Sequence, residues 1–357
     1  MSHPSRRQFS NLLIIVAVVL LLWWVARIVS FPEAWEVLRH LHVRDLFWLA
    51  LANLIVLWLL TGRWWMLLRG LNVRIPWHRL LGYRLAAFGL SYFTPGPHFG
   101  GEPLQVHLPM RHYDAPGDAA LAAVTLDKLL ELLVNFSFLV VAAVYVFGQG
   151  TFARGSSLSA LAYALILLVI PIGLLAAIWA GRHPLAGGLA LLRRVWANGS
   201  LRRIQERVAQ GEELAAALCR QRPWSVAGAL LFALLSWAAM IGEFWLATHV
   251  LGLGLSLGQA VTAMLAARIA ILFPLPAGLG ALEASLVLAM GALGAGPSAG
   301  LSLALLIRTR DVILGLTGLA IGGVSLWPGR RKHAQADLDE SQRKSQRRDV
   351  SIEKSTP

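Results

Sequence analysis

Long apolar segments alternate along the chain with short basic or polar stretches. The hydrocarbon core of a bilayer is about 30 Å thick, and an α-helix needs about 20 residues to cross it. Segments of roughly this length cover residues 11–29, 46–61, 119–147, 158–180, 225–251 and 298–326. Their apolar runs are continuous, which favours helices over the alternating strands of a membrane barrel. The pattern predicts an all-α polytopic membrane protein with about six full spans.

Two further apolar segments, residues 80–110 and 257–293, are interrupted by proline and glycine. Neither half of either segment is long enough to cross a bilayer by itself. We therefore expect each segment to form a re-entrant hairpin, in which a broken helix enters the membrane and leaves it on the same side.

An internal repeat relates these two segments, because an offset of 181 residues superimposes them. The matched residues are a proline, a glutamate and the next membrane-depth charge: Pro95 with Pro276, Glu102 with Glu283, and Asp127 with Arg308. In membrane proteins, paired Gly/Pro-interrupted segments in the two halves indicate a substrate site near the bilayer midplane.

Basic residues concentrate in three regions, which are the N-terminus (1–10), a loop (182–222) and a polar tail (329–357). Cytoplasmic segments of membrane proteins carry an excess of Lys and Arg. Six spans and two re-entrant hairpins within a transmembrane domain at 11–328 place all three regions in the cytoplasm. The hairpins then enter from opposite faces, so the repeats have inverted topology. We expect the loop to contain an amphipathic surface helix and the tail to be disordered.

Composition supports this assignment and excludes a soluble globule, because 57% of residues are hydrophobic, 14% are charged and the mean hydropathy is +0.61. The net charge of +13 is compatible with nucleic-acid binding. However, the arginines lie beside apolar spans, which favours anionic lipid as their partner and argues against nucleic acid. The single cysteine, Cys219, excludes an internal disulfide.

Six charged residues lie at two equivalent depths inside predicted spans, where each costs about 2.5 to 3.5 kcal/mol unless it has a polar environment or a partner. They are Asp127, Lys128, Glu131, Arg308, Arg310 and Asp311. Helical spacing allows Lys128 to reach Glu131, and the two triplets can meet across the pseudo-twofold axis. Two interpretations remain: an ion-pair network that holds the repeats together, or a polar cavity that binds a charged headgroup.

The breaks themselves carry glycines that permit close backbone approach and anion binding at a helix N-terminus, namely Gly96, Gly100, Gly101, Gly278 and Gly280. Glu102 and Glu283 have no cation beside them in the sequence, so Arg84 and Arg268 are candidate partners. Glu243, alone in its span, is either a proton-coupling group or a hydrogen-bonded interior residue.

The complete set of candidate substrate-binding residues is Arg84, Pro95, Gly96, Gly100, Gly101, Glu102, Asp127, Lys128, Glu131, Glu243, Arg268, Pro276, Gly278, Gly280, Glu283, Arg308, Arg310 and Asp311. The nearby His98, His107 and His112 are not spaced as metal ligands on a helix, so we expect no metal and no cofactor. Nucleotide-binding and hydrolase motifs are not found in the sequence, and no ATP hydrolysis is expected.

Three segments resemble the lysylphosphatidylglycerol synthase transmembrane family, also called flippase-like (YbhN-like) domain proteins. They are TPGPHFGGEPLQV at 94–106, TLDKLLELL at 125–133 and PLPAGLGALEASL at 274–286. The chain differs from the family pattern at Pro97, where a glycine is usual, and at Gln105, where a basic residue is usual. The resemblance covers about residues 10–328. It implies a bacterial inner-membrane protein that moves a lipid or lipid-linked glycan between leaflets.

The leading hypothesis is accordingly a lipid translocase that is not an enzyme, with both termini in the cytoplasm. A membrane-embedded lipid-phosphate enzyme, such as a polyprenyl-diphosphate phosphatase, is the alternative, although the hydrophobic PLPAGLGALE break lacks the acidic and Ser/Arg-rich groups of such chemistry. A third possibility is a non-transporting partner of a glycosyltransferase. In two-part family members a soluble aminoacyl-transferase domain follows the membrane part; here a short tail follows, so we do not expect lysyl transfer.

Overall fold

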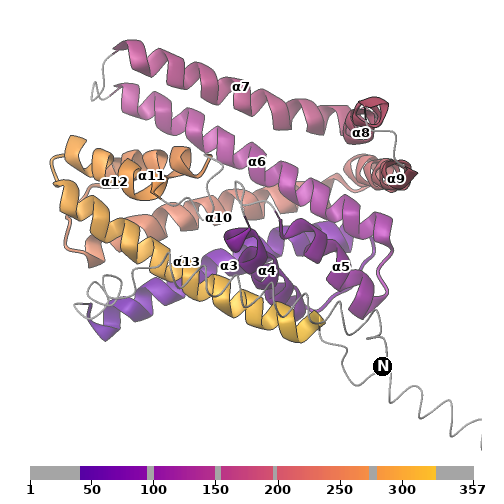
Figure 1. Cartoon of the computed structure of the whole chain (residues 1–357), viewed down its shortest axis with the longest axis horizontal. Coiled ribbons are helices and arrows are strands. Elements are labelled where there is room, and N and C mark those ends of the chain that lie inside the picture. The colour runs from indigo at the N-terminus through magenta and orange to yellow at the C-terminus, as the bar shows by residue number, and fades with distance from the viewer. Residues whose placement is uncertain (1–40, 95–99, 149–153, 196–198, 273–279, 327–357) are drawn as a thin grey trace, which may run out of the picture.

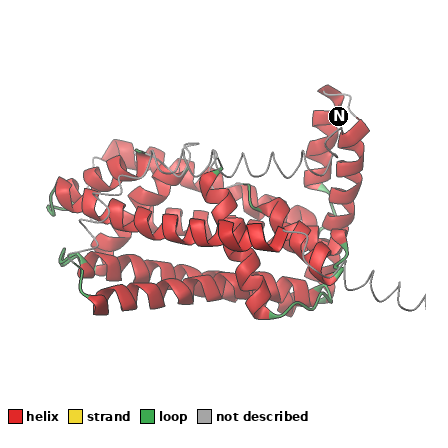
Figure 2. Ribbon diagram, turned by 60° about the horizontal axis from the view of Figure 1, so that its bottom comes forward, coloured by secondary structure: helices red, strands yellow, loops and turns green. Residues whose placement is uncertain are grey.

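The computed structural model describes residues 41–94, 100–148, 154–195, 199–272 and 280–326. Within these ranges the secondary structure consists of helices joined by turns and loops (Figure 2). The helices, labelled in Figure 1, are α3 (Val43–Gly70), α4 (Trp77–Phe93), α5 (Glu102–Tyr113), α6 (Gly117–Gly148), α7 (Arg154–Trp179), α8 (Pro184–Val195), α9 (Gly199–Gln221), α10 (Pro223–Val250), α11 (Leu257–Ile271), α12 (Ala281–Ala292) and α13 (Pro297–Leu326).

Four of these helices are long and apolar enough to cross a membrane: α3, α6, α10 and the part of α7 at 161–179. Helix α13 is also long, with 30 residues, and carries Arg308, Arg310 and Asp311. The predicted first span, residues 11–29, lies outside the described residues. The prediction of an all-α polytopic membrane protein is therefore confirmed.

The repeat predicted from the sequence is present in the helix order. Helices α10, α11, α12 and α13 each begin 179 or 180 residues after α3, α4, α5 and α6, respectively. The ends of the first helices match as well, because a residue in the left-handed region lies two positions after each, Asn72 after α3 and Gly252 after α10. In each case a backbone N–H just beyond bonds back into the last turn.

Helices α3 and α10 run antiparallel and side by side (Figure 1). The guanidinium of Arg222, just before α10, donates to the backbone oxygen of Gly70 at the end of α3, at 3.1 Å. Farther along the pair, the Asn53 amide donates to the Glu243 carboxylate at 2.6 Å. Equivalent helices of the two repeats thus have opposite directions, which is the arrangement of inverted repeats.

The first broken segment forms a helical hairpin made of α4 and α5. At its closed end the N–H of Gly101 donates to the Ser91 hydroxyl at 2.8 Å. At its open end the Tyr83 hydroxyl lies 2.8 Å from Nδ1 of His112. The 12 residues of α5 extend about 18 Å, less than the bilayer core, as expected for a re-entrant element. Helices α11 and α12 form the second hairpin (Figure 1).

Glycine allows α4 to lie against α13 at backbone contact distance. A Cβ atom on Gly318 would overlap the carbonyl oxygen of Leu85, and one on Gly89 would overlap that of Gly315. The equivalent pair, α11 and α6, is in contact over a smaller part of its length. At the positions equivalent to Gly315 and Gly318, α6 carries Val134 and Ser137. Glycine is thus absent from these two positions of α6, and the two halves differ in packing although they share a topology.

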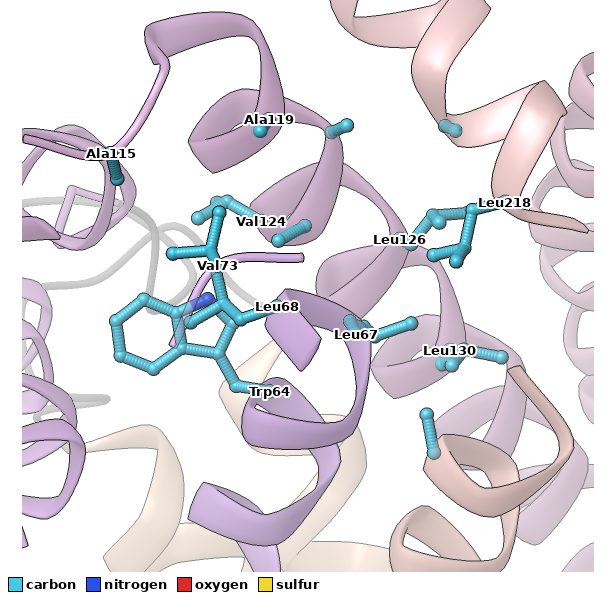
Figure 3. Packing of buried hydrophobic residues seen from close by; sticks show 14 of the residues in the cluster. Trp64, Leu67, Leu68, Val73, Ala115, Ala119, Val124, Leu126, Leu130 and Leu218 are labelled. Atoms are coloured by element: carbon cyan, nitrogen blue, oxygen red, sulfur yellow. The ribbon is translucent and has the colours of Figure 1, made fainter. Parts of the chain in front are cut away.

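An apolar core surrounds the position where α3 meets α6 (Figure 3). Trp64 and Leu67 of α3 are fully buried, as is Leu126 of α6. These residues flank Arg63 and Asp127 in the sequence. The core therefore fixes the depth and the relative rotation of two helices that carry opposite charges.

The basic loop between the repeats folds into α8 and α9, which appear nearly end-on in Figure 1 while α6 and α7 run across the view. The buried Glu212 carboxylate of α9 accepts hydrogen bonds from the backbone N–H groups of Leu185 and Ala186, at 2.7 and 3.1 Å. A carboxylate at a helix N-terminus satisfies unpaired N–H groups and is favoured by the helix dipole. Glu212 thus fastens α8 to α9.

Candidate functional site

The first charged cluster is centred on Asp127 of α6, which is 2% exposed. Arg63 of α3 donates to it through Nε at 2.6 Å, and Arg84 of α4 through an Nη at 2.5 Å. Arg63 also binds the Glu131 carboxylate at 2.9 Å. Arg63 is completely buried and Arg84 is 7% exposed. Three helices therefore meet at one ion-paired group, and Arg63, Arg84 and Asp127 within it are almost completely buried.

The same cluster has a more accessible part, which is formed by Lys128, Glu131 and Glu102. The Lys128 ammonium lies 3.1 Å from the Glu131 carboxylate and 3.4 Å from that of Glu102 on α5. The other Glu102 oxygen accepts a hydrogen bond from the Gly100 N–H at 2.8 Å. Because these three side chains remain between 21% and 36% exposed, a ligand can reach the charges that join the hairpin to α6.

Glycines at the first break position Glu102. Gly100 has φ +140°, a conformation that side chains rarely allow. A Cβ atom on Gly101 would overlap the carbonyl oxygen of Ala87 on α4. The chain can therefore turn tightly beneath α4 and begin α5 with a carboxylate in its first turn, where the helix dipole favours negative charge.

The second cluster contains two separate groups of ion pairs. Arg308 of α13 lies 2.6 Å from the Glu283 carboxylate of α12. Arg310 binds two carboxylates, those of Glu243 at 2.5 Å and Asp311 at 2.8 Å. Glu243 is thus an ion-paired interior residue, and Asn53 of α3 supplies its second hydrogen bond.

The charges of the two clusters are exchanged between equivalent helices. In the first repeat a cation on α3, Arg63, meets an anion on α6, Asp127. In the second repeat an anion on α10, Glu243, meets a cation on α13, Arg310. Each repeat therefore contains its own cross-helix ion pair, although the residues themselves are not copies of each other.

Arg268 of α11 differs from the other basic residues of the clusters. Its guanidinium lies over the Trp237 ring at 4.7 Å and donates to the Met240 sulfur at 3.4 Å. Among the described residues, no carboxylate oxygen lies within ion-pair distance of it. It is a cation held by an aromatic face and a thioether.

Several sequence-based expectations about partners were wrong. Glu102 pairs with Lys128 and not with Arg84, while Glu283 pairs with Arg308 and not with Arg268. The described ion pairs of Asp127, Lys128 and Glu131 are made within their own repeat, and none connects them to the charges of α13. The expected pairing of Lys128 with Glu131 is confirmed.

Arg63 was not predicted as a site residue, because the apolar segment expected at 46–61 ends two residues before it. The apolar sequence Trp-Trp-Met-Leu-Leu directly after Arg63 is the signal that places it inside a helix. Arg74 and Arg79, which follow α3 in the sequence, are exposed.

Of the remaining predicted site residues, Gly280 has φ +75° and precedes α12. Pro95, Gly96, Pro276 and Gly278 lie outside the described residues, as does His98. His112 contacts Tyr83, and His107 is exposed on α5. Where the structure describes the chain, no three His, Cys, Asp or Glu residues are grouped as metal ligands.

Fold and site together define a class of protein: a polytopic α-helical membrane protein with two inverted repeats, each with a re-entrant hairpin and a buried charge cluster. The chain belongs to the family described as the lysylphosphatidylglycerol synthase TM region, whose model matches residues 11–318. No curated protein and no solved structure matches the chain significantly.

Proposed function

We propose that the protein is a translocase that moves a lipid or lipid-linked glycan between the leaflets of a bacterial inner membrane. One observation carries the proposal: in each of the two inverted repeats, a charged cluster lies where the re-entrant hairpin meets a long helix. Such pairs of broken helices bind substrate near the midplane in membrane transporters. Membership of a lipid-related membrane family supports the same conclusion.

The geometry supports binding of a charged headgroup by exchange of partners. The Lys128 ammonium is shared by two carboxylates, one of them on the hairpin, and all three groups are partly exposed. A headgroup phosphate can replace Glu102 as the partner of Lys128, while a headgroup amine can pair with the released carboxylate. Charges then change partners without being left unpaired in a medium of low dielectric constant, where an unpaired charge is costly.

Inverted repeats supply the conformational part of the proposal. Rocking of one repeat against the other opens the same central site to one leaflet and then to the other. The contact between α4 and α13 is close and extensive, whereas the contact between α11 and α6 is less extensive. The two hairpins are therefore packed unequally against the long helix of the other repeat. The lipid chains stay in the bilayer throughout.

In this proposal the arginine-rich segment containing α8 and α9 faces the cytoplasm and binds anionic lipid, and both chain termini are cytoplasmic. The substrate is membrane lipid, and no nucleic acid is bound. A glycosyltransferase that makes or uses the lipid-linked glycan is a possible partner.

Leaflet exchange by the wild-type protein tests the proposal. Proteoliposomes would carry labelled phosphatidylglycerol, phosphatidylethanolamine, phosphatidylcholine or a polyprenyl phosphate, with protein-free liposomes as the control. The proposal predicts faster exchange for at least one lipid and thereby identifies its headgroup class. Release of phosphate from a polyprenyl diphosphate without exchange would contradict it in favour of a membrane-embedded enzyme. If the protein shows neither activity and co-purifies with a glycosyltransferase, the proposal is contradicted and a scaffold is favoured.

A further inference from the structure

Arg268 is a guanidinium at membrane depth whose described partners carry no full negative charge. It touches the Trp237 ring and the Met240 sulfur. The attraction between a cation and an aromatic face is smaller than the cost of placing an arginine in the membrane. The residue therefore favours an additional, anionic partner.

Its donors are also free to receive such a partner. Arg63 and Arg308 have nitrogen atoms that lack hydrogen bonds but are fully buried. Arg268 makes a single described hydrogen bond, is only partly buried, and none of its nitrogens belongs to that buried group. The remaining N–H groups can therefore form the paired hydrogen bonds with which arginine binds phosphate.

Aromatic packing supports the guanidinium of Arg268 on the side of Trp237. Trp237 packs in turn on Phe138 of α6, with ring centroids 4.8 Å apart. The equivalent of Arg268 in the first repeat is Ala87, and there the carbonyl oxygen is covered by Gly101. The second repeat thus has an arginine where the first has close backbone packing.

Charges of both clusters act on Arg268. Arg310 of the second cluster repels it most strongly, while Asp311 and Glu243 of that cluster and Glu131 of the first attract it. A phosphate at Arg268 is therefore within electrostatic range of the groups that the proposed translocation site uses.

We propose that Arg268, held against Trp237, is an anion-binding residue that takes the phosphate of the ligand. The inference rests on the proposed function for its setting, because a lipid headgroup is then the natural source of the phosphate. Free phosphate offers the same chemistry, so the test must distinguish the two sources.

Binding to the purified full-length protein in neutral detergent micelles tests this without any transport step. The probes are short-chain phosphatidylglycerol, the matching neutral diacylglycerol, and sodium phosphate. The variants are Arg268→Gln, Arg268→Lys and Trp237→Leu, with Arg44→Gln as a control that removes the same charge from an exposed position at the start of α3, outside the arginine-rich segment.

We expect Arg268→Gln to weaken phosphatidylglycerol binding about tenfold or more, a loss typical of one charge-assisted contact. Arg268→Lys should lie between this variant and wild type because lysine binds phosphate only as a point charge. Trp237→Leu should also weaken binding, because the guanidinium loses its support. Diacylglycerol binding should be the same in every variant, and phosphatidylglycerol binding by Arg44→Gln should equal that of wild type. Competition by sodium phosphate would identify a site for free phosphate, and its failure to compete would identify a site for lipid phosphate.

Unchanged phosphatidylglycerol binding by Arg268→Gln, or an equal loss in Arg44→Gln, would overturn the assignment. If Arg268→Gln does not fold, the Lys and Leu variants decide in the same way. Leaflet exchange that persists in Arg268→Gln with wild-type headgroup preference would refute this inference alone. Lack of exchange by the wild-type protein would refute the proposed function and leave the binding result to stand by itself.

Discussion

Removal of one partner from the buried Arg63–Asp127 pair should be strongly destabilising. Arg63 is fully buried and Asp127 is 2% exposed. Breaking a buried ion pair typically costs about 3 to 5 kcal/mol, because the remaining charge stays desolvated. Arg84 keeps its contact with Asp127 at 2.5 Å. We therefore expect Arg63→Met to lower the free energy of unfolding by about 3 kcal/mol, at the low end of that range.

Charge balance within the first cluster makes the prediction sharper. The cluster has three cations, Arg63, Arg84 and Lys128, and three anions, Glu102, Asp127 and Glu131. Removing both members of the central pair, in Arg63→Met/Asp127→Leu, leaves two of each sign. The double variant should consequently lose less stability than the sum of the single variants, with a coupling energy of about 1 to 3 kcal/mol.

Reversible unfolding in mixed detergent micelles of increasing sodium dodecyl sulfate content, followed by circular dichroism, would measure these free energies. Arg74→Met serves as the control because Arg74 is exposed on the turn after α3. A loss below about 1 kcal/mol for Arg63→Met, or strict additivity of the double variant, would refute the view that this pair is a dry, coupled unit.

Two further predictions concern helix packing. Gly318→Val should destabilise the protein by about 1 to 3 kcal/mol or abolish folding, because a Cβ atom there overlaps Leu85, while Gly323→Val meets no atom and should be tolerated. Thermal unfolding followed by size-exclusion chromatography would measure the difference. Equal tolerance of the two variants would contradict the close helix contact. Glu212→Ala should release the N-terminus of α8 at a cost of about 0.5 to 2 kcal/mol and speed tryptic cleavage after the arginines of that helix. The control Glu213→Ala, at an exposed position, should be cleaved at the wild-type rate. Identical digestion of both variants would show that the capping bonds do not hold α8.

The repeat could be found from the sequence because its markers are local. Closely spaced proline and glycine residues favour a break in a helix, and in each repeat a glutamate follows the proline at the same distance. The same reasoning predicted two hairpins and their antiparallel repeats, and the structure has both. It worked because backbone constraints leave few alternatives inside a membrane.

Partners within the site could not be predicted from the sequence in the same way. Glu102 meets Lys128, 26 residues later, because α5 turns back toward α6. Spacing along one helix cannot reveal such a contact. Arg63 was not predicted because the apolar window ended before it, although α3 continues to Gly70. The close packing of α4 on α13 depends on single glycines. Matching the two halves by a sequence offset does not show which glycines lie at a helix contact.

Leaflet exchange by the two hairpin variants, Glu102→Gln and Glu283→Gln, tests the central claim most directly. Both are reconstituted at wild-type density after a check of folding, with Glu213→Gln as the control on the exposed face of α9. The account predicts that each hairpin variant loses most of the exchange and that the control retains it, because both repeats must release and rebind their charge partners. Wild-type exchange in both hairpin variants would show that the charged hairpins do not form the translocation site.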